Sequence, residues 1–159
     1  MLRPAILYKA QIEEGFMKYQ YSQDMFFESG WLGNWMTDIT LDSNGSQYNW
    51  AIIDGKENLI GYFGYEIDFY SGNMQHFSLL SFDRGNPIIG KSVFEEIERC
   101  IKEYNLHRIE WRMVGGNPAE RGYDAFLRKH NGKKHILTDV VKDCYGKYHD
   151  NIIYEIIIE

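Results

Sequence analysis

Hydrophobic and polar positions alternate along the chain with two different periods. Residues 5–20 place large apolar side chains at positions 8, 12, 16 and 19, and this spacing predicts an amphipathic helix. Residues 21–36 are rich in aromatic side chains and are broken by Gly30 and Gly33, so we expect a short helix followed by a loop. Residues 37–47 are polar and predict a surface loop.

The pattern then changes to the period of two that is typical of strands. Residues 48–54, 59–70 and 75–82 are predicted strands, and short turns containing Gly and Asn separate them. Such turns favour antiparallel pairing. Alternation along the middle strand predicts two faces. One face is expected to carry Leu59, Phe63, Tyr65, Ile67 and Phe69, and the other Ile60, Tyr62, Glu66 and Asp68.

The second half of the chain combines helices and strands. Apolar residues recur at helical spacing over 90–104, which predicts a helix with one buried face. Residues 107–114 predict a strand. Asn117 and Pro118 then have the features of a helix start, and we expect that helix to extend to Asn131-Gly132. Residues 134–144 and 152–158 are predicted strands separated by a turn at Tyr145-Gly146-Lys147.

Composition narrows the class of protein. The 159 residues are 44% hydrophobic and 16% aromatic, so we expect one globular domain over residues 1–159. The net charge of −6, without a run of basic residues, argues against a nucleic-acid partner. No apolar run is long enough for a membrane span, and we expect no targeting segment. Cys100 and Cys144 are isolated, as in a cytoplasmic protein with reduced thiols.

The stretch around residues 78–92 carries the clearest candidate chemistry. An apolar strand enters a turn of Gly, Asn and Pro, which opens into a helix. The free N–H groups and positive dipole at such a helix start favour a phosphate. Gly85–Ser92 also matches the Walker A pattern of nucleotide-binding proteins. However, the loop follows hairpins, and the next strand ends in Gly115-Gly116 without an acidic residue. We therefore interpret the Walker A match as coincidental.

The order of predicted elements resembles the GNAT N-acetyltransferase superfamily over nearly the whole chain. Residues 84–90, Arg-Gly-Asn-Pro-Ile-Ile-Gly, are similar to the pyrophosphate loop of that family. Asn117 followed by Tyr123 resembles its Asn…Tyr motif. Residues 143–154 also resemble the C-terminal motif of many GNAT proteins. The residues that carry this likeness are Asp143, Gly146, Tyr148, His149, Asp150 and Tyr154.

The resemblance implies a mixed α/β fold (α+β by some schemes), with a mostly antiparallel sheet flanked by helices on both faces. It also implies acetyl-CoA as a cosubstrate, held by loop amides and by the edge of the strand ending at residue 82. Two parallel strands, residues 75–82 and 107–114, would splay apart to form the slot. The expected CoA-binding residues are Leu80, Ser81, Phe82, Arg84, Gly85, Asn86, Ile89, Gly90, Lys91 and Asn117.

Acyl transfer to an amine needs a base for the amine and an acid for the departing thiolate. Glu66, with Asp68 two residues further along the same strand face, is the candidate base. The resemblance makes Tyr123 the candidate acid. The five histidines lack metal-site spacing, so we expect no metal.

The sequence therefore predicts an N-acetyltransferase that acts on an amine of a small molecule or of a protein, and a homodimer is compatible with this prediction. Two other functions remain open at this point. The chain could be a catalytically degenerate, CoA-binding regulatory or interaction module, or, less in keeping with the element order, a small NTP-binding protein that uses a Walker A loop.

Overall fold

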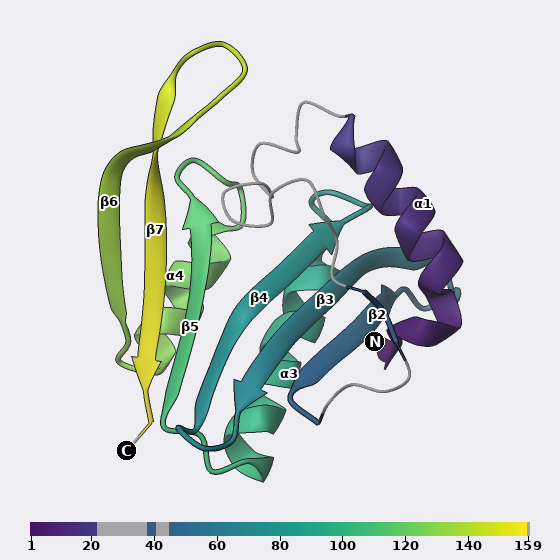
Figure 1. Cartoon of the computed structure of the whole chain (residues 1–159), viewed down its shortest axis with the longest axis horizontal. Coiled ribbons are helices and arrows are strands. Elements are labelled where there is room, and N and C mark those ends of the chain that lie inside the picture. Colours follow the sequence, from purple (N-terminus) through teal and green to yellow (C-terminus); the bar gives the residue numbers. More distant parts are fainter. Residues whose placement is uncertain (22–37, 41–44, 159) are drawn as a thin grey trace.

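The computed structural model describes residues 1–21, 38–40 and 45–158 (Figure 1). The N-terminal elements are β1 (Leu2–Pro4), the 3-10 turn η1 (Ala5–Tyr8) and α1 (Lys9–Gln20). Three strands follow, β2 (Gln47–Ile53), β3 (Leu59–Asp68) and β4 (Asn73–Ser81). The second half contains α3 (Pro87–Glu103), β5 (Arg108–Val114), α4 (Glu120–Lys129), β6 (Lys133–Lys142) and β7 (Tyr148–Ile157).

The described strands form one seven-stranded sheet in the order β1-β2-β3-β4-β5-β7-β6. Among these strands, every neighbouring pair is antiparallel except β4 and β5, which run parallel. The mixed, mostly antiparallel sheet predicted from the sequence is thus confirmed. β4 and β5 are fully described, and they pair only where Asn73 lies opposite Arg108 and Met74 opposite Ile109. Beyond these residues the two strands diverge (Figure 1).

Helices cover both faces of the sheet, as expected. α3 and α4 lie on one face, and α1 lies on the other (Figure 1). α3 contributes Val93, Ile97 and Cys100 to the larger buried cluster, and α1 contributes Ile12 and Phe16 to the smaller one. The helical spacing of apolar residues in both segments produces these buried faces.

Several elements differ from the sequence predictions. β1 was not predicted, because three residues are too few to show a period, and it forms by pairing Leu2 with Ile52. α3 begins at Pro87 rather than at residue 90, so residues 87–90 belong to its first turn and not to a loop. Asn86 is the cause, because its side chain accepts a hydrogen bond from the Ile88 N–H at 3.0 Å and caps the helix. The predicted helix within residues 21–36 lies outside the described residues.

A β-bulge in β3 changes one predicted face. Ile53 pairs with Leu59 and Ile52 with Gly61, which leaves Ile60 as an extra residue. Ile60 consequently belongs to the same buried cluster as Phe63, whereas Leu59 packs against the cluster on the α1 face. The predicted positions of Leu59 and Ile60 were therefore wrong, since one inserted residue reverses strict alternation.

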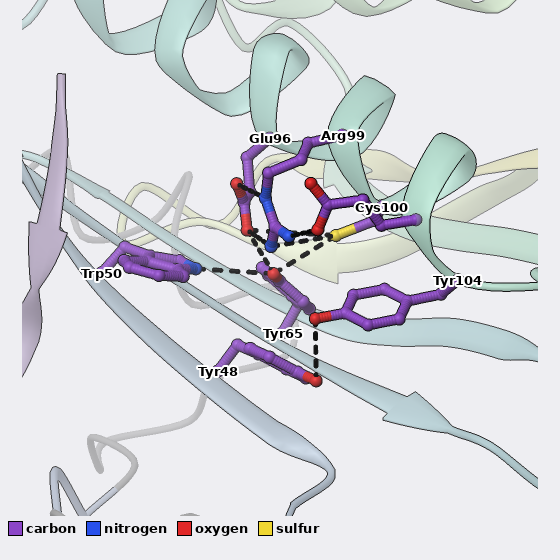
Figure 2. A network of polar contacts seen from close by, with 8 residues as sticks. Tyr48, Trp50, Tyr65, Glu96, Arg99, Cys100 and Tyr104 are labelled. Carbon is purple, nitrogen blue, oxygen red and sulfur yellow. Dashed lines mark hydrogen bonds and ion pairs between the residues drawn. The ribbon is translucent and has the colours of Figure 1, made fainter.

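A buried polar network lies between α3 and the sheet (Figure 2). The Tyr65 hydroxyl donates to Glu96 Oε1 at 2.5 Å and lies 3.3 Å from Cys100 Sγ. Arg99 binds both Glu96 oxygens through its Nε and Nη2 atoms, at 2.8 and 2.7 Å. Glu96 is only 5% exposed. Its charge is thus compensated by a bidentate guanidinium and a hydroxyl donor.

The two cysteines are expected to differ strongly in reactivity. Cys100 is fully buried, and burial raises the pKa of its thiol to about 11, whereas Cys144 is exposed. Because the thiolate is the reactive form, iodoacetamide should modify Cys144 in the native protein at neutral pH and leave Cys100 unmodified. Mass spectrometry of tryptic peptides measures both, and denaturation in urea should make both react. Equal native modification of Cys100 would contradict its buried environment.

Candidate functional site

A cleft of about 470 Å³ occupies the space between the diverging strands β4 and β5. Its apolar wall includes Phe77 and Leu79 of β4 and Trp111 and Met113 of β5. Phe77 stacks on Trp111, with ring centroids 5.9 Å apart and planes within 12°. Where β4 and β5 no longer pair, aromatic side chains therefore fill the gap between them. These side chains form the floor of the cleft.

One end of the cleft is formed by the 83–86 loop and the first turn of α3. Asn86 caps the helix and also donates from Nδ2 to Asp83 at 2.7 Å. Gly85 has a φ of +86°, which favours glycine, and a side chain there would meet no atom within 4 Å. α3 carries no acidic residue in its first turn. The loop therefore presents open backbone and a positive helix end to the cleft.

Arg84 adds a cation to this end of the cleft. Its guanidinium donates to the Tyr19 hydroxyl of α1 and lies 6.0 Å from the centre of that ring. This contact connects the 83–86 loop to the helix on the opposite face of the sheet. Arg84 is thus held beside the helix terminus, where it can add to the attraction for an anion.

The N-terminal end of α4 lines the other side of the cleft. Asn117 accepts a hydrogen bond from the Ala119 N–H at 2.9 Å, but α4 begins at Glu120 with Ala119 at its N-cap, so the helix starts later than the sequence predicted. Gly122 and Tyr123 also line the cleft. The Tyr123 ring packs edge-on against Trp111, with centroids 5.8 Å apart. The candidate acid therefore lies beside the aromatic floor.

Polar side chains reach the cleft from the face of the sheet opposite α3. Trp111 and Met113 of β5 pack into the α3 cluster, so Glu110 and Arg112 between them point toward the opposite face. Glu110 accepts from Arg108 at 2.5 Å and lies 3.5 Å from Arg112. His76 of β4 lines the cleft as well. The cleft is therefore apolar on the α3 side and polar on the α1 side.

Most of the residues predicted to bind CoA or to catalyse line this cleft. They are Ser81, Arg84, Gly85, Asn86, Ile89, Gly90, Asn117 and Tyr123. These residues come from one strand, two loops and two helices, and the fold gathers them around one space. The functional role of each remains a prediction.

Four predicted residues do not line the cleft. Leu80 and Phe82 pack toward α1, because they alternate with the cleft-lining Leu79 and Ser81. Lys91 projects from the exposed side of α3, and its ammonium lies 3.8 Å from Glu95. Glu66 lies on β3, with its carboxylate Oε2 2.9 Å from His76 Nδ1. It reaches the cleft only through that histidine.

Asp68, the second candidate base, has a structural contact in the β3–β4 turn. Its carboxylate accepts from the Ser71 hydroxyl at 2.5 Å and from the Tyr70 N–H at 2.9 Å. These hydrogen bonds, with that of Ser71 the larger, hold the pKa of Asp68 below its usual range. A carboxylate stabilised in this way is a weaker base, and it lies outside the cleft lining.

Sequence reasoning missed several cleft residues. His76, Glu110 and Arg112 were not singled out, because nothing in their local pattern distinguishes them from solvent-facing strand residues. Trp111 was not singled out as a cleft residue either. Its buried indole N–H has no hydrogen-bond partner among the described residues. The parting of strands 75–82 and 107–114 was expected from the resemblance, but which of their side chains border the gap was not.

Two other features are absent from residues 1–21, 38–40 and 45–158. No group of three or more His, Cys, Asp or Glu side chains in this part of the chain could hold a metal ion. Within the same residues, no helix is both long and apolar enough to cross a membrane.

The sheet order, the parted parallel strands and the helix start between them define the fold of the GNAT N-acetyltransferase superfamily, and the chain has this fold. A solved structure of spermidine N-acetyltransferase from Vibrio cholerae, in complex with CoA and spermine, matches with a TM-score of 0.70 at 15% identity. The match covers 99% of this chain and 94% of that one.

Two further structures of the Vibrio cholerae enzyme match over a shorter region. A dodecameric form in an intermediate state gives a TM-score of 0.57, and a complex with manganese ions gives 0.58. Each shares 18% identity and covers 72% of this chain and 66% of the other. No protein-family model matches the sequence, and no curated protein matches it. The likeness is therefore one of fold.

Proposed function

We propose that this protein is an acyl-CoA-dependent N-acyltransferase that transfers an acetyl group from acetyl-CoA to an amine. The observation that carries this proposal is the cleft between β4 and β5, which ends at the capped N-terminus of α3 and the open Gly85 loop. Parted parallel strands and a helix terminus are what a long ligand with a phosphate at one end requires.

The residues present fit acetyl-CoA as a substrate. The 83–86 loop and Arg84 would hold the pyrophosphate. From Ser81 back to Gln75 the cleft follows β4 for about 20 Å, at roughly 3.3 Å per strand residue, which suits an extended pantetheine arm.

The acceptor is proposed to be an amine, and polyamines are the first to test. The structural neighbours are named for spermidine N-acetylation, and one of them was solved with spermine. The protein's net charge of −6 also favours a cationic acceptor over an anionic one. A lysine-containing peptide represents the alternative class, a protein amine.

The two alternatives from the sequence have less support. A Walker A function would need Lys91 to reach the phosphate, but Lys91 lies outside the cleft lining and beside Glu95. A degenerate CoA-binding module shares the fold and the cleft with an enzyme, so only turnover separates it from the proposed function.

The proposal predicts selective stabilisation by CoA ligands. At about 100 times their Kd, acetyl-CoA and CoA should each raise the free energy of unfolding by about 2.7 kcal/mol, which thermal denaturation detects. ATP with Mg²⁺ should produce no shift. Acetyl-CoA with spermidine, spermine or the lysine peptide should then release free thiol. Stabilisation by ATP–Mg²⁺ alone would overturn the proposal, and CoA binding without thiol release would favour the degenerate module.

A further inference from the structure

We propose that His76 is the general base that deprotonates the acceptor amine, and that Glu66 acts as its positioning residue. This inference rests on the proposed function and refines it. Glu66 alone was the base expected from the sequence, but its carboxylate is separated from the cleft by the His76 ring. The imidazole, rather than the carboxylate, is therefore the group that can meet a substrate.

His76 lies where β4 and β5 begin to part. The last paired residues are Met74 and Ile109, and His76 follows two positions later and lines the cleft. The phosphate end of the cleft lies at the other end of β4, beyond Ser81. A long ligand anchored by its phosphates would consequently bring its far, acyl-bearing end toward His76.

A β-bulge directs the His76 side chain. Gly64 pairs with Ser78 and Glu66 with Gln75, so β4 holds one residue more than β3 between these pairs. His76 has a φ of +55°, a conformation that is uncommon outside glycine. Met74 and Phe77 both pack toward α3, and the extra residue sends His76 to the opposite face, where Glu66 lies. That is the polar side of the cleft.

The contact with Glu66 defines the state of the imidazole. His76 Nδ1 and Glu66 Oε2 are 2.9 Å apart. A carboxylate only accepts, so Nδ1 donates in this contact, and in the neutral imidazole Nε2 then holds the lone pair. The two side chains are 56% and 31% exposed, so the ring remains accessible to a substrate. This is the tautomer that a general base needs at Nε2.

The other charged groups around the cleft are already paired. Glu110 of β5 contacts Arg108 and Arg112, and Arg84 of the 83–86 loop contacts Tyr19 of α1. Glu66 of β3 is therefore the carboxylate that bonds to His76. Its negative charge stabilises the imidazolium that forms when the ring accepts a proton.

The proposed step forms one C–N bond and breaks one C–S bond. The amine nitrogen attacks the thioester carbonyl and forms the new C–N bond, while one N–H proton passes to His76 Nε2. The C–S bond breaks, and the departing sulfur takes up one proton, for which Tyr123 is the predicted donor. The products are an amide and free CoA thiol. The imidazolium then releases its proton to solvent, and the Tyr123 phenolate takes one up, which restores both side chains.

The test replaces His76 with Asn, which tolerates a positive φ and has no basic group. His76→Asn should lower kcat/KM for spermidine at pH 7 by about 10²–10⁴-fold. Its affinity for CoA, measured by calorimetry, should stay within threefold of the wild type. His135→Asn is the matched control, because His135 pairs with Glu155 at 3.4 Å, is 52% exposed and lies outside the cleft lining. This control should retain full activity.

The pH dependence of kcat/KM in Glu66→Gln distinguishes a positioning role of Glu66 from a purely structural one. The wild-type kcat/KM should fall at acidic pH as the base takes up a proton. Glu66→Gln removes a negative charge that favours the imidazolium. The fall of kcat/KM at acidic pH, the acid limb of the profile, should therefore move to lower pH, and the maximal rate should be smaller. In His76→Asn this limb should disappear. A purely structural Glu66 would lower the rate without moving the limb, which would overturn its positioning role.

Two results would overturn the inference in distinguishable ways. A wild-type protein that binds no CoA, or binds it without transfer to spermidine, spermine or the lysine peptide, overturns the proposed transferase and the role of His76 together. A wild-type protein that acetylates one of these amines while His76→Asn keeps its rate and its acid limb overturns the role of His76 alone.

Discussion

Replacing Gly85 with Asp is expected to weaken CoA binding by about 30-fold at low salt. The new carboxylate would stand in the open loop that lines the phosphate end of the cleft. Two like-charge contacts with a pyrophosphate, at about 1 kcal/mol each near 4 Å in water, account for that factor. Calorimetric titration with CoA measures the change. Because salt screens exposed charges, the loss should shrink as ionic strength rises.

Gly85→Asn is the matched control for this experiment. Asn and Asp have nearly the same shape and meet the same backbone requirement, a φ of +86°. Only the charge differs between them. Gly85→Asn should therefore bind CoA with an affinity close to that of the wild type. If both variants lose affinity equally and independently of salt, the loop does not hold the phosphates.

Replacing Glu96 with Ala is expected to lower the free energy of unfolding by about 3 kcal/mol. The change removes the acceptor of the Tyr65 hydroxyl and both oxygens bound by Arg99 (Figure 2). Removing one partner of a buried ion pair costs about 3–5 kcal/mol. Arg99 keeps its contact with Glu103, which places the loss at the lower end of that range. Urea denaturation measures it.

Glu95→Ala provides the comparison on the same helix. Glu95 is adjacent in sequence, is 67% exposed and has a long contact of 3.8 Å with Lys91. Its loss should change stability by less than about 0.5 kcal/mol. Equal effects of the two substitutions would mean that the buried network contributes nothing beyond helix propensity.

Local patterns in the sequence were sufficient to predict most of the secondary structure. The apolar stripe of residues 8, 12, 16 and 19 became η1 and α1, and the alternating segments became β2, β3 and β4. These patterns report which face of an element is buried, and that is a property of neighbouring residues. β1 escaped prediction because its stability comes from pairing with β2, at a distance of about fifty residues.

The phosphate end of the candidate site was also readable from the sequence. Asn86 and Pro87 specify a helix start, and Gly85 specifies a turn before it, so the local signals for an anion site were all contiguous. The direction in which each side chain points was harder to predict from the sequence. Leu80, Phe82 and Lys91 belong to the right segments, but strand alternation and helix rotation direct them away from the cleft.

By itself, then, the sequence determined the order of elements, the turn and helix start that favour a phosphate, and through its resemblance the fold of the GNAT superfamily. Only the tertiary structure decided where β4 and β5 part, because that depends on pairing between strands more than thirty residues apart. It also decided that a bulge turns His76 toward Glu66. A single added residue reverses the direction of a strand side chain. The local pattern of apolar and polar residues does not show where such a residue is added.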